Sequence, residues 1–153
     1  MSIPSGIRIS DECIAAVHAL HSPKRCPNKL RFVIFKVDDD QQSVVVEASS
    51  SEPDYETFRQ MLCDASDHKT TSLAPPRYAV YDVDYDLGQE GKRTKSIFIS
   101  WIPVHTPLKL CMVYASTREY LRKALNIEVS IHADSIDELE WESILEKVSS
   151  GRA

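Results

Sequence analysis

Residues 30–37 constrain the fold of this chain more than any other segment. They read Leu-Arg-Phe-Val-Ile-Phe-Lys-Val, an apolar run rich in valine, isoleucine and phenylalanine. A strand with one face in water alternates apolar and polar residues, whereas a nearly continuous apolar run indicates a strand buried on both faces. Other elements must therefore cover both sides of the sheet that contains this strand.

The hydropathy pattern elsewhere predicts helices and strands that can form such a sheet. Ser10 is a suitable N-cap, and Ile14, Val17 and Leu20 follow it at helical spacing, so a first helix is expected there. Further strands are expected at 43–48, 77–87, 96–102 and 128–131, and further helices after Pro53, from Pro107 to about Leu125, and around 141–148. Residues 88–94 are expected to form an exposed hairpin. The element order predicts an α/β (α+β) fold, with a central mixed β-sheet flanked by helices on both faces.

The length of 153 residues predicts a single domain spanning 1–153, with a flexible N-terminal arm at 1–9 and a C-terminal tail at 148–153. No run of about 18 apolar residues is present, so no membrane span is expected. The first residues do not resemble a signal peptide, and the four scattered cysteines form no C-x-x-C pair. These features indicate a soluble cytoplasmic protein with reduced thiols.

The acidic repeat Asp82-x-Asp84-x-Asp86 is the strongest candidate for a metal site. An EF-hand loop that starts at Asp82 needs glycine at its sixth position, which is Leu87 here. Apolar or aromatic residues alternate with the three acids, as in a half-buried strand whose acids face the solvent. We therefore interpret this repeat as part of a strand.

Other kinds of site find less support. His18 and His21, with Cys13 and Cys26 nearby, match no zinc spacing, so no metal is expected. The sequence contains no G-x-S-x-G elbow, and its four glycines form no phosphate-binding loop. These observations predict a protein that is not an enzyme and that uses no cofactor.

Charge is distributed unevenly along the chain. The whole chain carries −5, which argues against a nucleic-acid partner. Residues 92–95 carry +3 and residues 107–125 carry another +3, which leaves −11 for the rest. Such separation indicates either a basic surface for an acidic partner or a solvated hairpin beside an ordinary amphipathic helix. Composition alone leaves both interpretations open.

The helix expected from Pro107 is apolar on almost every side over residues 108–115. A surface helix ordinarily carries a single apolar stripe, with polar residues on its other side. The first half of this helix is therefore either enclosed in the core, which is the default, or keeps one apolar face for a partner.

Motifs spread over nearly the whole chain carry a resemblance to a known family. In chain order they are Ser5-Gly6, Arg77-Tyr78-Ala79-Val80-Tyr81-Asp82, Glu90-Gly91-Lys92-Arg93-Thr94-Lys95, Trp101-Ile102-Pro103, Pro107-Leu108-Lys109 with Met112-Val113-Tyr114-Ala115-Ser116, and Ser143-Ile144-Leu145-Glu146-Lys147-Val148. In these motifs the chain resembles the actin-depolymerising factor/cofilin family. The resemblance implies the ADF-homology fold and a protein that binds actin monomers and filaments. It also implies that the protein promotes filament severing and depolymerisation without any covalent step.

By this resemblance, two sets of residues contact actin. The monomer-binding set lies on the N-terminal arm and the long helix and consists of Ser5, Gly6, Lys109, Met112 and Ser116. The filament-binding set consists of Arg93, Lys95, Glu146 and Lys147. Within the first set, the helical residues follow one another at three- and four-residue steps, so they share one face of the helix.

The resemblance also implies regulation by phosphorylation and by lipids. A phosphate on Ser5 adds about −1.5 to −2 charges to a contact built on lysine, so we expect it to abolish actin binding. Four basic residues are expected to bind phosphoinositide head groups in competition with actin. They are Lys92, Lys109, Arg122 and Lys123.

The chain departs from the family pattern at Cys111 and Ser150, where the family usually carries basic residues. Cys111 removes one positive charge from the monomer-binding helix, and Ser150 removes one three positions after Lys147. Two alternative functions stay open: a relative that binds only monomers or filament branch junctions, and a phosphoinositide-binding surface module that would not need the apolar Met112. We expect a monomer located in the cytoplasm on the actin cytoskeleton, with the nucleus left open as a second location.

Overall fold

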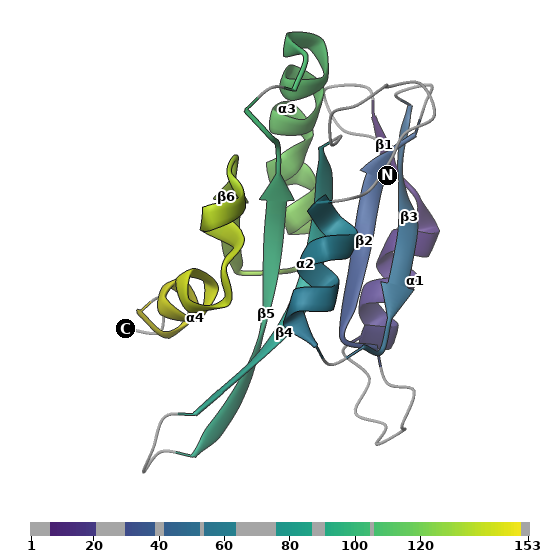
Figure 1. Ribbon diagram of the computed structural model, residues 1–153. Helices are drawn as coiled ribbons and strands as arrows, with labels where there is room; N and C mark the ends of the chain where they lie inside the picture. Colours follow the sequence, from purple (N-terminus) through teal and green to yellow (C-terminus); the bar gives the residue numbers. More distant parts are fainter. Residues whose placement is uncertain are drawn as a thin grey trace.

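Six strands form one mixed sheet in the computed structural model, which describes residues 7–20, 30–38, 42–52, 54–63, 76–86, 91–104 and 106–150 (Figure 1). The strands are β1 (Arg8–Ile9), β2 (Phe32–Val37), β3 (Ser43–Ser50), β4 (Arg77–Asp86), β5 (Lys92–Trp101) and β6 (Val129–Ala133). Their order across the sheet is β1-β3-β2-β4-β5-β6. The outer pairs, β1 with β3 and β5 with β6, are parallel, and the three inner pairs are antiparallel. The apolar strand β2 lies between two neighbours and is buried at five of its six positions, as its sequence predicts.

Helices cover both faces of this sheet. In the described part of the chain they are α1 (Asp11–Leu20), α2 (Tyr55–Cys63), α3 (Leu108–Ala124), the short 3-10 helix η2 (Ile136–Leu139) and α4 (Trp141–Ser150). Side chains of α1 and α3 share one buried cluster with the sheet, and side chains of α2 and α4 share a second. Figure 1 shows α2 in front of the sheet and α3 behind it. The predicted fold class, a mixed sheet with helices on both faces, is therefore confirmed.

The boundaries predicted at the two ends of the chain are wrong. Residues 8–9 of the expected arm form β1, which pairs in parallel with the start of β3, and Ile7 and Ile9 are buried. At the other end, α4 continues to Ser150 and Val148 is fully buried, so the expected tail at 148–153 begins inside a helix. A two-residue strand is too short to produce a hydropathy pattern, which explains why β1 was not predicted.

The region predicted as the hairpin 88–94 also differs. Strand β5 begins at Lys92, and residues 92–96 pair with residues 86–82 of β4 to form a two-stranded ribbon beyond the rest of the sheet. Asp82, expected to face the solvent, is 5% exposed and accepts a hydrogen bond from the Ser96 hydroxyl. The two strands of the ribbon are joined by backbone hydrogen bonds, which do not depend on the type of side chain. The hydropathy pattern therefore does not show where the strands end and the turn begins.

The long helix α3 begins at Leu108, one residue later than predicted. Pro107 has ψ of 141°, which is extended, and acts as the N-cap, and its carbonyl oxygen accepts the Cys111 N–H at 2.9 Å. The helix ends at Ala124, and the next residue, Leu125, still donates its N–H to the Leu121 carbonyl at 2.9 Å. No helix among the described residues is long and apolar enough to cross a bilayer.

An ion pair between a buried arginine and a partly exposed glutamate joins the start of β4 to β3. Arg77 is 2% exposed, and its guanidinium donates to both carboxylate oxygens of Glu47, at 2.7 and 2.9 Å. The same side chain donates to the carbonyl oxygen of Pro76 at 2.8 Å. Because the two strands are not neighbours in the sheet, this pair crosses over β2 and ties the sheet together.

The Arg77–Glu47 pair predicts a stability difference between two glutamate variants. Glu47→Gln leaves the buried guanidinium without its counter-charge, and we expect it to lower the free energy of unfolding by about 2–3 kcal/mol. Glu56→Gln breaks the ion pair with Arg59, which lies on the surface of α2, and should cost less than about 1 kcal/mol. Urea unfolding of both variants measures the difference, and equal losses would contradict the structural role of Arg77.

Candidate functional site

Helix α3 has one buried face and one free face. Tyr114, Thr117 and Leu121 are buried against the sheet, whereas Leu108 and Met112 remain 75% and 62% exposed. The exposed positions form what we call the α3 face: Leu108, Lys109, Met112, Ala115, Ser116, Glu119, Tyr120 and Lys123. One side of the apolar 108–115 segment packs in the core, as the default interpretation predicts, and the other side has no covering element among the described residues. The use of that side for a partner stays a prediction.

The helical residues predicted to bind monomers lie together on this face. Lys109, Met112 and Ser116 are all exposed. The Ser116 hydroxyl donates to the Val113 carbonyl at 3.1 Å, so it is held close to the helix surface. Lys109 is the basic residue nearest to Met112 on this face. The arrangement therefore presents a flexible apolar side chain beside one positive charge.

Two tyrosines hold α3 on the sheet. The Tyr78 hydroxyl of β4 donates to the Tyr114 carbonyl, and the Tyr114 hydroxyl accepts the Val37 N–H at 2.9 Å. The two rings lie 5.0 Å apart between centroids. Burial raises the pKa of both phenols above the usual tyrosine value, so they stay neutral at physiological pH. The α3 face is thus carried by a firmly packed helix.

Sequence reasoning missed two exposed apolar residues near the start of α3. They are Val104 and Ile136, which are 77% and 55% exposed. The Val104 N–H donates to the Asp134 carbonyl at 3.2 Å, which places the segment before α3 beside the end of β6. The signal in the sequence is weak, because a single exposed apolar residue is common on any surface.

The predicted residues of the N-terminal arm, Ser5 and Gly6, lie outside the described residues. The described chain starts at Ile7, which is buried in the same core cluster as α3 residues Tyr114 and Leu121. The predicted phosphorylation of Ser5 and the contact of Gly6 with actin therefore stay predictions.

The filament-binding residues predicted from sequence lie on the ribbon and on α4. Lys95 is half-buried and faces Val83 in the strand register, and Val83 packs in the same cluster as Ile144 and Val148 of α4. Arg93 pairs with Tyr85 in the same register, and its side chain lies outside the described part. We call Lys95, Glu146 and Lys147, with the position of Arg93, the ribbon–α4 surface.

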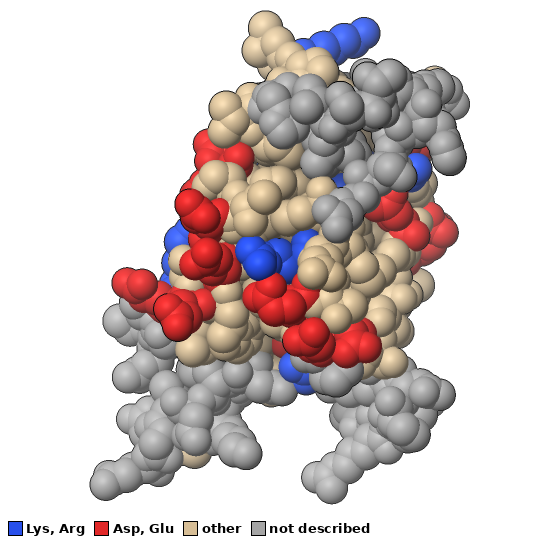
Figure 2. Space-filling model, in the orientation of Figure 1, with Lys and Arg blue, Asp and Glu red and all other residues tan. Residues whose placement is uncertain are grey.

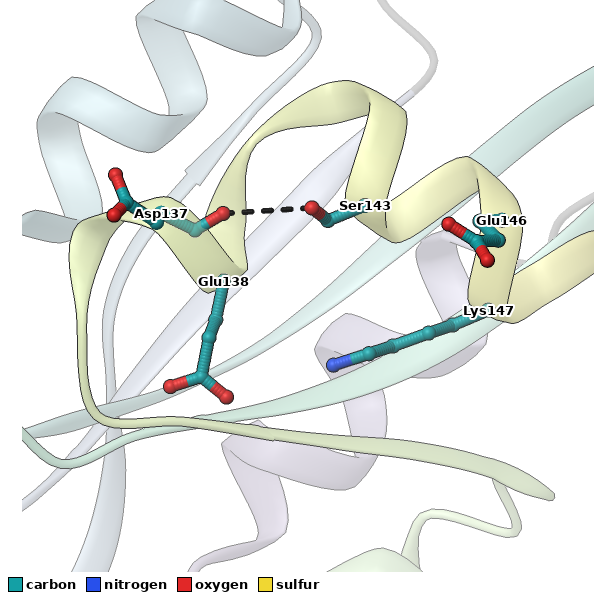
Figure 3. Close-up of a pocket in the computed structure, with 5 residues that line it drawn as sticks. All are labelled: Asp137, Glu138, Ser143, Glu146 and Lys147. Atoms are coloured by element: carbon teal, nitrogen blue, oxygen red, sulfur yellow. Dashed lines mark hydrogen bonds between the residues drawn. The ribbon is translucent and has the colours of Figure 1, made fainter.

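A hollow of about 410 Å³ separates η2 from α4, lined by Asp137, Glu138, Ser143, Glu146 and Lys147 (Figure 3). The Ser143 hydroxyl donates to the Asp137 carbonyl at 3.5 Å, and Lys147 extends from α4 toward Glu138. Two predicted filament-binding residues, Glu146 and Lys147, therefore stand on the rim of one hollow.

The surface around this hollow is acidic. Residues 134–147 contain six carboxylates and one lysine, and Figure 2 shows acidic side chains predominating over η2 and α4. Positive charge on a partner would complement these acids. Among the described residues, no three histidine, cysteine or acidic side chains form a group that could hold a metal ion.

The four residues predicted to bind phosphoinositides do not form one cluster. Lys109 and Lys123 lie near opposite ends of α3, about 21 Å apart along its axis. The Arg122 guanidinium is already engaged by Glu119, at 2.8 Å, and by the Ile127 carbonyl, at 2.9 Å. The side chain of Lys92 is not among those described. The structure thus leaves Lys109 and Lys123 as separate exposed charges.

Comparison with known proteins identifies the family. The family described as "Cofilin/tropomyosin-type actin-binding protein" matches residues 6–149. The chain is 40% identical over 146 residues to a cofilin of Schizosaccharomyces pombe, covering 95% of this chain and 96% of that protein. It is 37% identical over 153 residues to a cofilin of Gibberella zeae, covering 97% of each. The chain belongs to the cofilin family.

Solved structures agree with this assignment. The crystal structure of cofilin from Streptomyces griseoflavus has a TM-score of 0.79 and 33% identity, and the match covers 95% of this chain and 98% of that one. Human coactosin-like protein has a TM-score of 0.72 at 19% identity, which shows a shared fold alone. As a cofilin-family member, the chain is an actin-binding protein.

A pair of carboxyls beside the hollow has opposite pKa shifts. The Glu138 carboxylate accepts the Asp134 N–H at 3.2 Å and the Ser135 hydroxyl at 3.3 Å. A side-chain hydrogen bond between the two carboxyls, together with the negative charge of Glu138, raises the pKa of Asp134. The same side-chain hydrogen bond, together with the one from the Asp134 N–H, lowers the pKa of Glu138. When the pair carries one proton, that proton therefore resides mainly on Asp134.

We expect Glu138→Gln to lower the pKa of Asp134, because a glutamine amide donates to the carboxylate and carries no charge. Asp134 binds its proton more tightly in the folded chain, so its contribution to stability exists at acidic pH and is lost as the pH rises through its folded pKa. Titration of the side-chain carboxyl carbons by NMR measures the change. Asp137→Asn is the control and should leave Asp134 unchanged; an unshifted Asp134 in the Glu138 variant would contradict the pairing.

Proposed function

We propose that this cofilin-family protein binds actin monomers through the α3 face and filaments through the ribbon–α4 surface, and that it thereby severs and depolymerises filaments. The observation that carries the proposal is the exposed apolar part of α3, where Leu108 and Met112 are 75% and 62% exposed on a helix whose other face is buried. An exposed apolar row on an otherwise well-packed helix is typical of a helix that docks into a groove of its partner.

On the α3 face, Met112 serves as the apolar anchor and Lys109 as the charged contact. Methionine has an unbranched, polarizable side chain that adapts to the wall of a groove. An exposed lysine at the edge of such a contact attracts acidic groups of actin and favours the correct orientation. Ser5 and Gly6, which lie outside the described residues, belong to the same proposed set of monomer contacts.

On the ribbon–α4 surface, the basic residues Arg93 and Lys95 face a neighbouring actin subunit together with Glu146 and Lys147. The two surfaces are carried by opposite faces of the sheet, because α3 packs on one core cluster and α4 on the other. A protein with actin contacts on both sides can touch two subunits of one filament and alter how they pack.

The action consists of binding alone, with no covalent step, and the chain acts as a single copy on the cytoplasmic actin cytoskeleton. Phosphoinositide binding is a second candidate activity, and the exposed lysines Lys109 and Lys123 favour it. Because these lysines belong to the α3 face, a lipid bound there would compete with actin monomers.

Charge reversal distinguishes the two surfaces. We expect Lys109→Glu to weaken monomer binding at least ~10-fold, because it places a negative charge opposite acidic groups of actin. Arg93→Glu combined with Lys95→Glu should spare monomer binding and reduce the amount of protein that sediments with filaments. Fluorescence titration of labelled actin monomers and filament co-sedimentation measure the two effects.

Each charge-reversal variant is the control for the other, and thermal unfolding shows whether each is folded. Normal filament binding by both variants would refute the assignment of the surfaces. A phosphoinositide module without actin activity would show neither extra actin in the supernatant nor protein in the pellet.

Negative charge at Ser5 is expected to have a selective effect. Ser5→Glu imitates part of the charge of a phosphate and should weaken monomer binding, whereas Ser5→Ala should bind as the natural chain does. The same monomer titration measures both variants. Equal affinity of the two would exclude Ser5 as a phosphorylation switch.

A further inference from the structure

Tyr120 is a large aromatic side chain on the α3 face that the monomer-binding set does not include. It is 44% exposed, although it lies in the second half of the helix, where the other exposed residues are polar or charged. Among the described residues, large exposed apolar side chains are few: Met61, Val104, Leu108, Met112, Tyr120 and Ile136. Three of these six belong to α3, so the apolar part of the α3 face does not end at Met112.

The helix geometry places Tyr120 in line with the monomer-binding residues. At about 100° per residue, Tyr120 lies about 20° from Lys109 around the helix axis, about 40° from Ser116 and about 80° from Met112. Along the axis it lies about 12 Å beyond Met112. Tyr120 therefore continues the same face for two further turns.

The backbone at Tyr120 is held firmly in place. The next residue, Leu121, is fully buried in the core cluster shared with α1. Arg122 donates to the Ile127 carbonyl at 2.9 Å, which fixes the end of the helix to the segment that follows it. A tyrosine on such a support loses little conformational freedom on binding, because its side chain has only two rotatable angles.

We propose that Tyr120 is a second anchor of the actin contact, so that the contact extends from Leu108 to the last two turns of α3. The proposal rests on the proposed function, because actin is the occupant of the α3 face. Tyrosine is among the residues that most often dominate binding energy at protein interfaces, since its ring buries a large area and its hydroxyl tolerates water at the rim. The continuity with Lys109 and Ser116 favours actin over a separate partner for this side chain.

The experiment measures the affinity of labelled actin monomers for the full chain and for four variants. We expect Tyr120→Ala to weaken binding ~10-fold, a loss typical of an interface anchor, and Tyr120→Phe to stay within about 2-fold, because the ring supplies the contact. Met112→Ala is the positive control from the proposed monomer surface. Met61→Ala is the matched negative control, since Met61 is 38% exposed on α2, on the other face of the sheet.

The outcomes separate this inference from the proposed function. Normal binding by Tyr120→Ala together with weakened binding by Met112→Ala would overturn the inference and leave the proposed function intact. Equal losses in Tyr120→Ala and Tyr120→Phe would also overturn it, because the ring would then not be the anchor. Absence of binding by the natural chain would overturn the proposed function itself. Each variant should unfold at the same temperature as the unsubstituted chain, because the substituted side chain is exposed. This check shows that a variant with weakened binding is still folded.

Discussion

The attachment of α3 to the sheet through Tyr114 is the constraint on which the proposed actin-binding face depends. One residue supplies two buried contacts: its hydroxyl accepts the Val37 N–H from β2 and its carbonyl accepts the Tyr78 hydroxyl from β4. A buried polar group that loses its partner costs about 1–3 kcal/mol, so each contact fixes the position of the helix. Because Tyr114 points into the core, the opposite side of the same turns must face outward, and Met112 is displayed there.

Much of this arrangement follows from hydropathy. The run at 30–37 correctly predicts a strand buried on both faces, and the spacing of Ile14, Val17 and Leu20 correctly predicts α1. These elements can be predicted from sequence because burial of one or both faces sets a regular pattern of apolar residues along them. The same rule explains the errors. Strand β1 has only two residues, too few to show a period. The predicted hairpin 88–94 includes Lys92 and the position of Arg93, which pair with β4 as the first residues of β5, because charged residues at the end of a ribbon look like turn residues in a hydropathy pattern.

The candidate site was predictable only in part, for a related reason. Motifs point to Lys109, Met112 and Ser116, and the structure places all three on the free side of one helix. Val104 and Ile136 could not be found in the same way, because their exposure depends on how the segment before α3 meets the end of β6. Asp82 shows the reverse case: an acid in an alternating pattern is expected outside, yet a serine on the neighbouring strand allows it to be buried.

The position of Cys111 on α3 lies away from the proposed monomer surface. Cys111 is half-buried and packs against the core cluster of α1 and α3, whereas Met112 and Lys109 lie on the free face. At about 100° per residue, Cys111 lies about 160° from Lys109 around the helix. A basic residue at that position would not contact actin directly. It would act through its electric field, which salt screens over about 10 Å. The lost charge should therefore slow the approach of actin more than it loosens the bound complex, since distant charges act mainly on association rates.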